Sequence, residues 1–185
     1  GKYVNLKDAY KSLDEALTHG GISNKVKVNL VRIESDKLKP NQIRKKLKNV
    51  SGLLIPGGFG KRGTEGKISA IKYARENKIP FLGICFGMQM AIIEFARNKL
   101  KIKKAGSSEL DENCYPVIGL INEWDKDGKI IKGTDKDLGG TMRLGLYEAK
   151  LRNNSAIKRI YKSNSIKERH RHRYEVNNNL KNEFE

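Results

Sequence analysis

The stretch KIPFLGICFGMQMAIIEFARN, residues 78–98, places a cysteine between two glycines, after an apolar run and before an amphipathic pattern. The run IPFLGI is typical of a short buried strand, and the residues after Cys85 have the apolar spacing of a helix. Two interpretations of Cys85 follow. It is either a small core residue where a buried strand meets a buried helix, or a nucleophile held at a sharp strand-to-helix turn.

The spacing of the glycines favours the second interpretation without excluding the first. Gly83 and Gly87 let the backbone turn tightly and let the helix approach the strand, as in the G-x-S-x-G elbow with sulfur in place of oxygen. The start of a helix also offers free N–H groups and a partial positive charge, which can bind an oxyanion.

The composition describes one globular domain with a polar surface, since 185 residues contain 37% hydrophobic and 32% charged side chains. No apolar run approaches the roughly 18 residues of a membrane span, and residues 1–10 lack the apolar core of a signal peptide. Only two cysteines, Cys85 and Cys114, are present, so we expect a reducing, cytoplasmic location.

The formal net charge of +17 points toward nucleic acid as a partner. The basic residues, however, are scattered as single lysines and lysine pairs, and few aromatic side chains stand between them to stack on bases. A general drift of composition toward Lys, Asn and Ile explains the charge equally well. We therefore expect no specific binding of nucleic acid.

Strand and helix patterns alternate along the first half of the chain, with apolar runs too continuous for one-sided sheets. This order predicts a flavodoxin-like, three-layer α/β domain with a mainly parallel central sheet covered on both faces. Gly20 and Gly21 are expected to end the first helix. The predicted strands cover residues 25–33, 51–58 and 79–84, and the predicted helices cover 6–21, 41–50, 64–78 and the residues after Cys85. Ile43 and Leu47 are spaced i, i+4 in the helix over 41–50, and Ile68 and Ile71 are expected to face inward in the helix over 64–78.

The second half has a different pattern. Strands are predicted over 115–121 and 144–151, a helix over 154–163, and an extended segment over 166–176. Residues 122–143 are rich in Gly, Asp and Lys, which predicts a mobile loop or a hairpin. The final strands of the expected sheet are missing from this pattern.

A second glycine loop follows the strand pattern at 51–58. Gly57, Gly58 and Gly60 offer backbone N–H groups with no side chains in the way, so the loop is either an oxyanion hole or a tight turn. It does not match the G-x-x-x-x-G-K-[ST] phosphate loop. Because parallel strands end at one edge of a sheet, this loop should lie beside Cys85, and the pair favours acyl transfer from a small amide or ester.

The motifs PGGFG and GICFGMQ together resemble the class I (triad) glutamine amidotransferases. Two further motifs, GTMRLG and RHRHRYEVN, make the chain similar to the C-terminal glutaminase domain of the CTP synthase family. The resemblance covers the whole chain. It implies hydrolysis of L-glutamine to glutamate and ammonia, which a separate N-terminal synthetase domain uses for the ATP-dependent amination of UTP to CTP.

The resemblance also assigns roles to individual residues. Cys85 is the expected nucleophile that forms a glutamyl thioester, and the backbone N–H groups of Gly58 and Phe86 are the expected oxyanion hole. Glu109 is expected to meet the α-amino group of glutamine, and Arg173 its α-carboxylate, since a zwitterion needs one anion and one cation. Without the resemblance, we would interpret Glu109 as a solvated acidic residue in a loop and Arg173 as an exposed charged residue on a strand. The expected glutamine contacts are Gly58, Phe86, Gly87, Met88, Gln89, Glu109 and Arg173.

By the same resemblance, this domain needs no cofactor and no metal. ATP and Mg belong to the synthetase domain, GTP is an activator, and the expected partners are L-glutamine, the synthetase domain of the same full-length chain and three further copies in a homotetramer. The polar loop from Trp124 to Leu138 is our candidate for sensing GTP.

One feature departs from the family. A triad cysteine needs a base with an orienting acid, which the family supplies in a late His-Pro-Glu motif. The 185 residues contain no such motif, and their histidines are His19, His170 and His172. We therefore predict a C-terminally incomplete amidotransferase domain over 1–185, without the synthetase domain and inactive alone. The alternatives are another cysteine hydrolase of the same fold, of peptidase or deglycase type, and a non-catalytic binding module.

Overall fold

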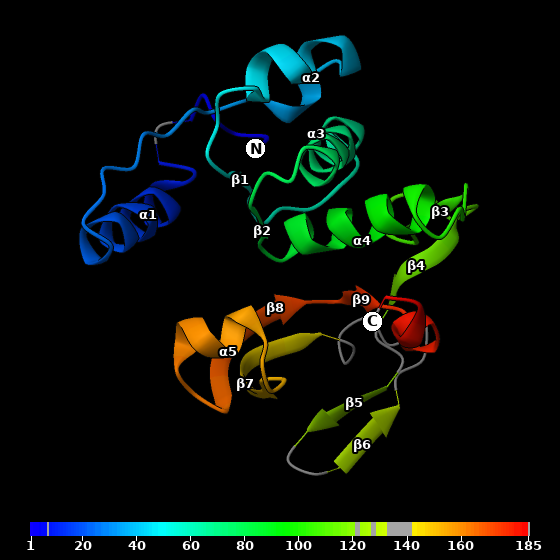
Figure 1. Cartoon of the computed structure of the whole chain (residues 1–185). Coiled ribbons are helices and arrows are strands. Elements are labelled where there is room, and N and C mark those ends of the chain that lie inside the picture. The colour runs from blue at the N-terminus through cyan, green and yellow to red at the C-terminus, as the bar shows by residue number, and fades with distance from the viewer. Residues whose placement is uncertain (7, 121–122, 127–128, 133–141, 185) are drawn as a thin grey trace.

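The computed structural model describes residues 1–6, 8–120, 123–126, 129–132 and 142–184. Within these ranges helices and strands alternate over residues 53–98, five strands then follow in succession, and Figure 1 labels the α-helices and strands. The helices are α1 (Lys11–Ser23), η1 (Ser35–Lys37), α2 (Pro40–Leu47), α3 (Thr64–Glu76), α4 (Phe86–Asn98), α5 (Ala156–Tyr161) and η2 (Asn178–Glu183). The strands are β1 (Leu53–Ile55), β2 (Phe81–Gly83), β3 (Ala105–Ser107), β4 (Tyr115–Leu120), β5 (Glu123–Lys126), β6 (Lys129–Lys132), β7 (Arg143–Lys150), β8 (Ser165–His172) and β9 (Tyr174–Val176).

The repeat of strand and helix that positions the candidate site is confirmed. β1 and β2 pair in parallel, with Leu53 opposite Phe81 and Ile55 opposite Gly83. Because each strand is followed by a helix, both strands point the same way and both end at one edge. Figure 1 shows α3 and α4 side by side next to this pair, and these two helices are in contact along their lengths.

The main hydrophobic core lies between α3, α4 and the strands. The 3.6-residue periodicity of both helices puts one face inward: Ile68 and Ile71 of α3 are buried as predicted, and Met90 and Ile93 of α4 lie against them in the same cluster. A second, smaller cluster joins α2 to α3. The predicted inward pair Ile43 and Leu47 of α2 packs there with Ala70.

A second sheet continues from the C-terminal end of α4. β3 and β4 pair in parallel, and β9 adds to the other side of β4 in the antiparallel direction, with Ile118 opposite Val176. Val117 and Ile118 are fully buried in the main core. The chain therefore brings residue 176 back against strand residues nearly sixty positions earlier, beside α4.

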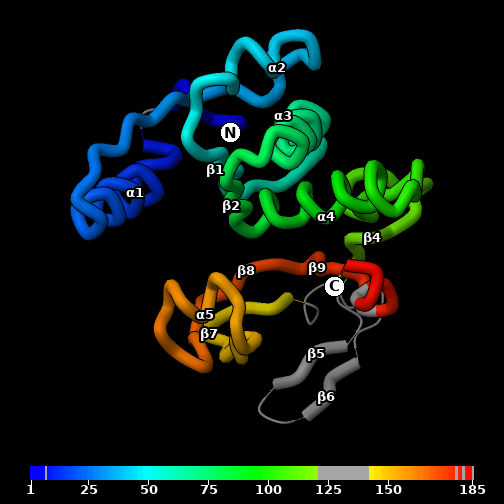
Figure 2. Tube along the Cα trace, viewed as in Figure 1, coloured from blue at the N-terminus to red at the C-terminus, as the bar shows by residue number. Residues whose placement is uncertain are grey.

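Two hairpins complete the second half. β7 and β8 pair antiparallel from Arg143 opposite His172 to Lys150 opposite Ser165, with α5 in the connection, and Figure 2 shows this hairpin apart from α3 and α4. Of the two alternatives for 122–143, a mobile loop or a hairpin, β5 and β6 form a hairpin, while residues 122, 127–128 and 133–141 lie outside the described residues. The extended prediction for 166–176 is confirmed by β8 and β9.

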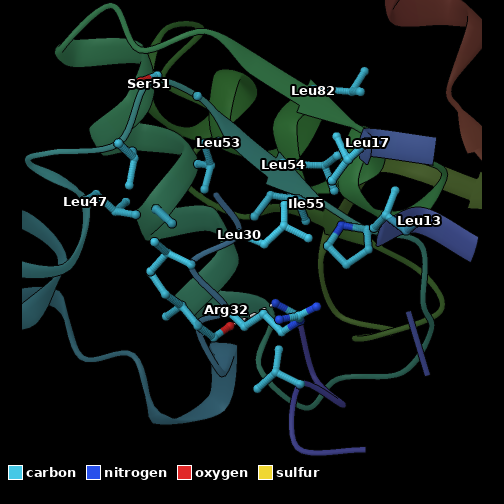
Figure 3. A pocket seen from close by; sticks show the side chains of 18 of the residues that line it. Leu13, Leu17, Leu30, Arg32, Leu47, Ser51, Leu53, Leu54, Ile55 and Leu82 are labelled. Carbon is cyan, nitrogen blue, oxygen red and sulfur yellow. Dashed lines mark hydrogen bonds between the residues drawn. The ribbon is translucent and has the colours of Figure 1, made fainter. Parts of the chain in front are cut away.

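The strand predicted over residues 25–33 is wrong. The segment is extended but has no strand partner, and its Val26 and Val31 are 60% and 67% exposed. A cavity of about 870 Å³ separates the segment from β1, and Figure 3 shows Leu30 and Arg32 on one side of it with Leu53 and Leu54 among the lining residues. An alternating pattern becomes a strand only when a neighbouring edge accepts its hydrogen bonds, and here that edge is too far away.

Two smaller predictions are also wrong. The first helix continues through Gly20 and Gly21 and ends at Ser23. A Cβ on Gly21 would lie 2.8 Å from the carbonyl oxygen of Val26, so this glycine permits a close approach of the chain rather than ending the helix. The strand predicted as buried at 79–84 is partly open to solvent, since Phe81 and Leu82 are 37% and 53% exposed.

Candidate active site

Cys85 lies at a strained strand-to-helix turn. β2 ends at Gly83, Cys85 has φ 51° and ψ −107°, and α4 begins at the next residue. Positive φ is unfavourable for a residue with a Cβ and persists only where the surrounding structure holds it. The Cys85 side chain is exposed, which excludes the interpretation of this residue as part of the core. The turn therefore presents a thiol at the end of a strand, as an elbow does.

The two flanking glycines are required by close backbone contacts. A Cβ on Gly83 would lie 2.7 Å from the carbonyl carbon of Gly87, and a Cβ on Gly87 would lie 2.1 Å from the carbonyl oxygen of Ile55. Both distances are shorter than van der Waals contact, and both involve backbone atoms that cannot move aside cheaply. The G-x-C-x-G pattern thus has the geometric cause that the sequence suggested.

The glycine loop after β1 lies beside the cysteine. The Ile84 N–H donates to the Ile55 carbonyl at 3.0 Å, which extends the β1–β2 pairing to the two strand ends. A Cβ on Gly57 would lie 3.7 Å from the Cβ of Cys85. In the described part of the chain, no hydrogen bond occupies the backbone N–H of Gly58 or of Phe86. Both groups remain available as oxyanion donors.

Two lysines that the sequence did not single out lie against this loop. Lys67 of α3 is 1% exposed, and its Nζ lies 4.7 Å from the Phe86 ring centroid. Burial, then the charges of Lys2 and Arg62, lower the pKa of Lys67 to about 8. The Lys2 Nζ donates to the carbonyl oxygens of Phe59 and, at 2.6 Å, of Gly60. These cations make the loop positive, which favours a developing oxyanion.

Glu109 also reaches the glycine loop. It follows β3, and its Oε1 accepts a hydrogen bond from the backbone N–H of Gly60 at 3.0 Å. The side chain is half-buried, so the interpretation of Glu109 as a freely solvated loop acid does not hold. The Glu109 carboxylate thus contacts the loop that carries Gly58, although no sequence spacing relates Glu109 to Gly58.

Gln89 connects the elbow helix to the segment that carries Arg173. Gln89 follows Cys85 by one turn of α4, is 6% exposed, and donates its Nε2–H to the Tyr174 carbonyl at 2.9 Å. Arg173 lies directly before Tyr174, and its Nη1 is buried with no hydrogen-bond partner among the described residues. A buried guanidinium nitrogen without a partner is suited to an anionic ligand.

The remaining predicted residues divide between packing and exposure. Gly87 is buried against Ile55, whereas Met88 is 41% exposed beside the cysteine turn.

The histidines lie in two places. His19 is exposed on α1. His170 and His172 lie on β8 and are hydrogen-bonded to each other at 2.8 Å. Within the described residues, no histidine is hydrogen-bonded to Cys85, and no group of His, Cys, Asp or Glu could hold a metal ion.

The part of the chain that the structure describes includes no helix with both the length and the apolar character of a membrane span. The segment proposed for GTP, from Trp124 to Leu138, lies partly outside the described residues. Its role stays a prediction.

Comparison with known proteins agrees with this geometry. The family model for glutamine amidotransferase class-I matches residues 5–185. A CTP synthase of Pelagibacter ubique is 77% identical over 185 residues, covering 100% of this chain and 34% of the relative. A CTP synthase of Zymomonas mobilis is 56% identical over 188 residues, covering 100% of this chain and 35% of the relative. The chain therefore spans about a third of the length of these curated relatives.

Among solved structures, the glutaminase domain of Trypanosoma brucei CTPS with bound acivicin matches with a TM-score of 0.84 and 33% sequence identity. The match covers 100% of this chain and 69% of that one, and it confirms the predicted flavodoxin-like α/β fold. The family model and the elbow at Cys85 point the same way: the chain belongs to the class I glutamine amidotransferase family.

Proposed function

We propose that this chain is the glutaminase domain of a CTP synthase and that Cys85 is its nucleophile. The observation that carries the proposal is the exposed thiol at φ 51°, between a strand end and a helix start and beside a loop with free N–H groups. The names of the relatives support the choice of CTP synthase among the family's enzymes.

In the first proposed step, the Cys85 sulfur attacks the side-chain amide carbon of glutamine after giving up its proton to a base. The amide oxygen becomes an oxyanion, which the N–H groups of Gly58 and Phe86 stabilise beside the positive Lys67. The carbon–nitrogen bond then breaks, the nitrogen takes up a proton and leaves as ammonia, and a thioester remains. Water hydrolyses the thioester to glutamate and restores the thiol.

Two charged residues are proposed to orient the substrate. Arg173 has a buried nitrogen available for the α-carboxylate, and the Glu109 carboxylate lies on the glycine loop for the α-amino group. On this proposal the base is the histidine of the family's His-Pro-Glu motif, which the 185 residues do not contain. We accordingly propose that this chain by itself forms the thioester slowly and turns over poorly.

The wider assembly is proposed on the resemblance alone. Ammonia would pass to a synthetase domain in the same full-length chain, where ATP and Mg drive the amination of UTP to CTP. GTP would activate glutamine hydrolysis, and four copies would assemble. We also propose a cytosolic location, in which the unpaired Cys85 and Cys114 stay reduced.

A mechanism-based label tests the nucleophile directly. The glutamine analogue 6-diazo-5-oxo-norleucine should alkylate Cys85, and mass spectrometry of peptides should locate the adduct there. Glutamine in excess should slow the labelling, because both ligands occupy one site. The Cys85→Ser chain is the matched control and should stay unlabelled. Labelling at Cys114 alone, or labelling that glutamine does not slow, would contradict the proposal.

A further inference from the structure

Arg173 occupies the single position between two strands that belong to different sheets. β8 ends at His172 and pairs with β7, whereas β9 begins at Tyr174 and pairs with β4. Arg173 is therefore the one residue that connects the two sheets at this point of the chain. Where its guanidinium points depends on how firmly the residues on either side are held.

Side chains of β7, β8 and β9 contact one another around Arg173. Arg143 of β7 is opposite His172 in the register, and its Nε lies 2.8 Å from Oε1 of Glu175 on β9. The Arg143 Nη2 donates to Glu175 Oε2 at 3.3 Å. The Nδ1 of His172 lies 3.5 Å from the same Glu175 Oε1. These contacts join residues 172 and 175 on either side of Arg173, so the segment is held from both ends.

The hydrogen bond between the two histidines couples their tautomers. His170 Nδ1 and His172 Nε2 are 2.8 Å apart, so one nitrogen donates and the other accepts. We assign the proton of His172 to Nδ1, because this nitrogen lies 3.5 Å from the Glu175 carboxylate; its Nε2 is then the acceptor from His170. A proton on Nε2 of His172 would place two N–H groups against each other, so protonation either breaks this bond or forces His170 to move its own proton from Nδ1 to Nε2.

We propose that neutral His172, held between His170 and Glu175, is a positioning residue for Arg173, and that glutamine affinity falls when His172 takes up a proton. The inference rests on the proposed function, because it assigns Arg173 to the substrate carboxylate. It gives a role to Arg143 of GTMRLG and to His170, His172 and Glu175 of RHRHRYEVN, which the catalytic steps leave unused.

The charges around the pair agree with a neutral His172. Burial, then the charges of His170 and Arg143, lower the pKa of His172 below 6.5. Burial raises the pKa of Glu175, although Arg143 and His170 oppose that shift. A hydrogen bond with the Tyr174 backbone opposes the lowering of the His172 pKa, and the Tyr147 ring of β7 lies edge-on to His170 at 5.4 Å between centroids.

The direction of the pH effect follows from this shift. The unfolded chain binds the proton of His172 near pH 6.5, while the folded chain binds it only at lower pH, so stability falls as pH drops below 6.5. If only the neutral form holds Arg173 in place, glutamine affinity should fall by about tenfold for each pH unit below the folded pKa.

The experiment measures the Kd of glutamine by calorimetry between pH 7.5 and pH 5, in a Cys85→Ala background so that no substrate is consumed. The parent should bind more weakly at the acidic end, with a loss that approaches about tenfold per pH unit once the pH is below the folded pKa of His172. His172→Gln should bind with little dependence on pH, because its amide oxygen reaches the Nε2 position and accepts from His170 but takes up no proton. His172→Ala should bind weakly throughout.

His19→Gln is the control, since His19 is an exposed histidine on α1 outside this cluster, and it should keep the parent's pH dependence. Any titration of glutamine itself would appear equally in all variants. A pH dependence of His172→Gln equal to the parent's would overturn the inference and leave the proposed function intact. Absence of glutamine binding by the parent at pH 7.5 would instead refute the proposed function, and this inference with it.

A measurement without substitutions guards against variants that do not fold. In NMR spectra of the parent chain, the His172 ring should titrate below pH 6.5, and the backbone amide of Arg173 should shift with the same midpoint. An Arg173 amide that does not respond as His172 titrates would overturn the inference.

Discussion

The Glu109 carboxylate accepts a hydrogen bond from the backbone N–H of Gly60 at 3.0 Å, although the two residues are 49 positions apart in the sequence. Gly60 belongs to the loop that carries the proposed oxyanion donor Gly58, while Glu109 follows a strand of the other sheet. The bond therefore joins the proposed anchor for the substrate amino group to the loop that would stabilise the reacting amide.

The first prediction concerns the two substrate anchors. Glu109→Gln removes the charge but keeps an oxygen that can accept from Gly60, and Arg173→Met removes the cation at similar length. Each should weaken glutamine binding tenfold to a hundredfold, as expected for one charge-assisted contact worth about 1.5–3 kcal/mol. Titration calorimetry measures the change. Lys104→Gln, an exposed surface substitution, should leave affinity unaltered. Unchanged glutamine binding in both variants would mean that Glu109 and Arg173 do not form an amidotransferase substrate site.

The second prediction compares the two thiols. Burial and the charge of Asp111 raise the pKa of Cys114, whereas Cys85 is exposed at the elbow. Iodoacetamide should therefore modify Cys85 faster than Cys114 in the folded chain near neutral pH, because the thiolate is the reactive form. Mass spectrometry of peptides gives the two rates. In concentrated urea the rates should converge. Equal rates in the folded chain would show that the elbow does not expose the thiol.

The third prediction concerns glycines in opposite surroundings. Gly87→Ala should destabilise the chain by about 1–3 kcal/mol, because the new Cβ would overlap the Ile55 carbonyl oxygen. Gly20→Ala is the matched control, since nothing lies within 4 Å of its Cβ and the residue is inside α1. That substitution should stabilise the chain by about 0.5–1 kcal/mol. Urea unfolding measures both changes, and a neutral Gly87→Ala would disprove the close contact.

The fourth prediction concerns the ion pair between α3 and α4. Arg75 Nη2 lies 2.8 Å from Oε1 of Glu94, whose side chain is 1% exposed. Arg75→Met should cost about 3–5 kcal/mol in unfolding free energy, because it leaves a buried carboxylate without its partner. Arg32→Met breaks an exposed ion pair with Asp14 and should cost about 1 kcal/mol or less. Similar costs for both substitutions would contradict the burial of Glu94.

Several features could be predicted from the sequence because their causes are local. Helical spacing identified the inward pairs Ile43 and Leu47 in α2 and Ile68 and Ile71 in α3, since burial follows directly from a 3.6-residue period. The G-x-C-x-G motif identified the elbow because its two glycines are needed within a few residues of the cysteine. Only the resemblance to a known family pointed to Glu109 and Arg173, whose own sequence surroundings carry no signal.

Other features depended on partners that the sequence does not name. Residues 25–33 alternate like a strand, yet no neighbouring edge comes close enough to form its hydrogen bonds. Gly21 was read as a helix end, but in the fold it makes room for Val26. The burial of Lys67 under Phe86 likewise arises from the packing of two helices.

The sequence by itself determined the strand and helix repeat over residues 51–98, the elbow at Cys85 and the family, because these follow from periodicity and short motifs. The tertiary structure alone decided which distant residues meet. It brought Glu109 to Gly60, and it brought Arg143 to Glu175, two residues after Arg173. The physical reason is that hydrogen bonds and ion pairs act over a few ångströms, so a pair far apart in sequence forms only when the packing of strands sets that distance.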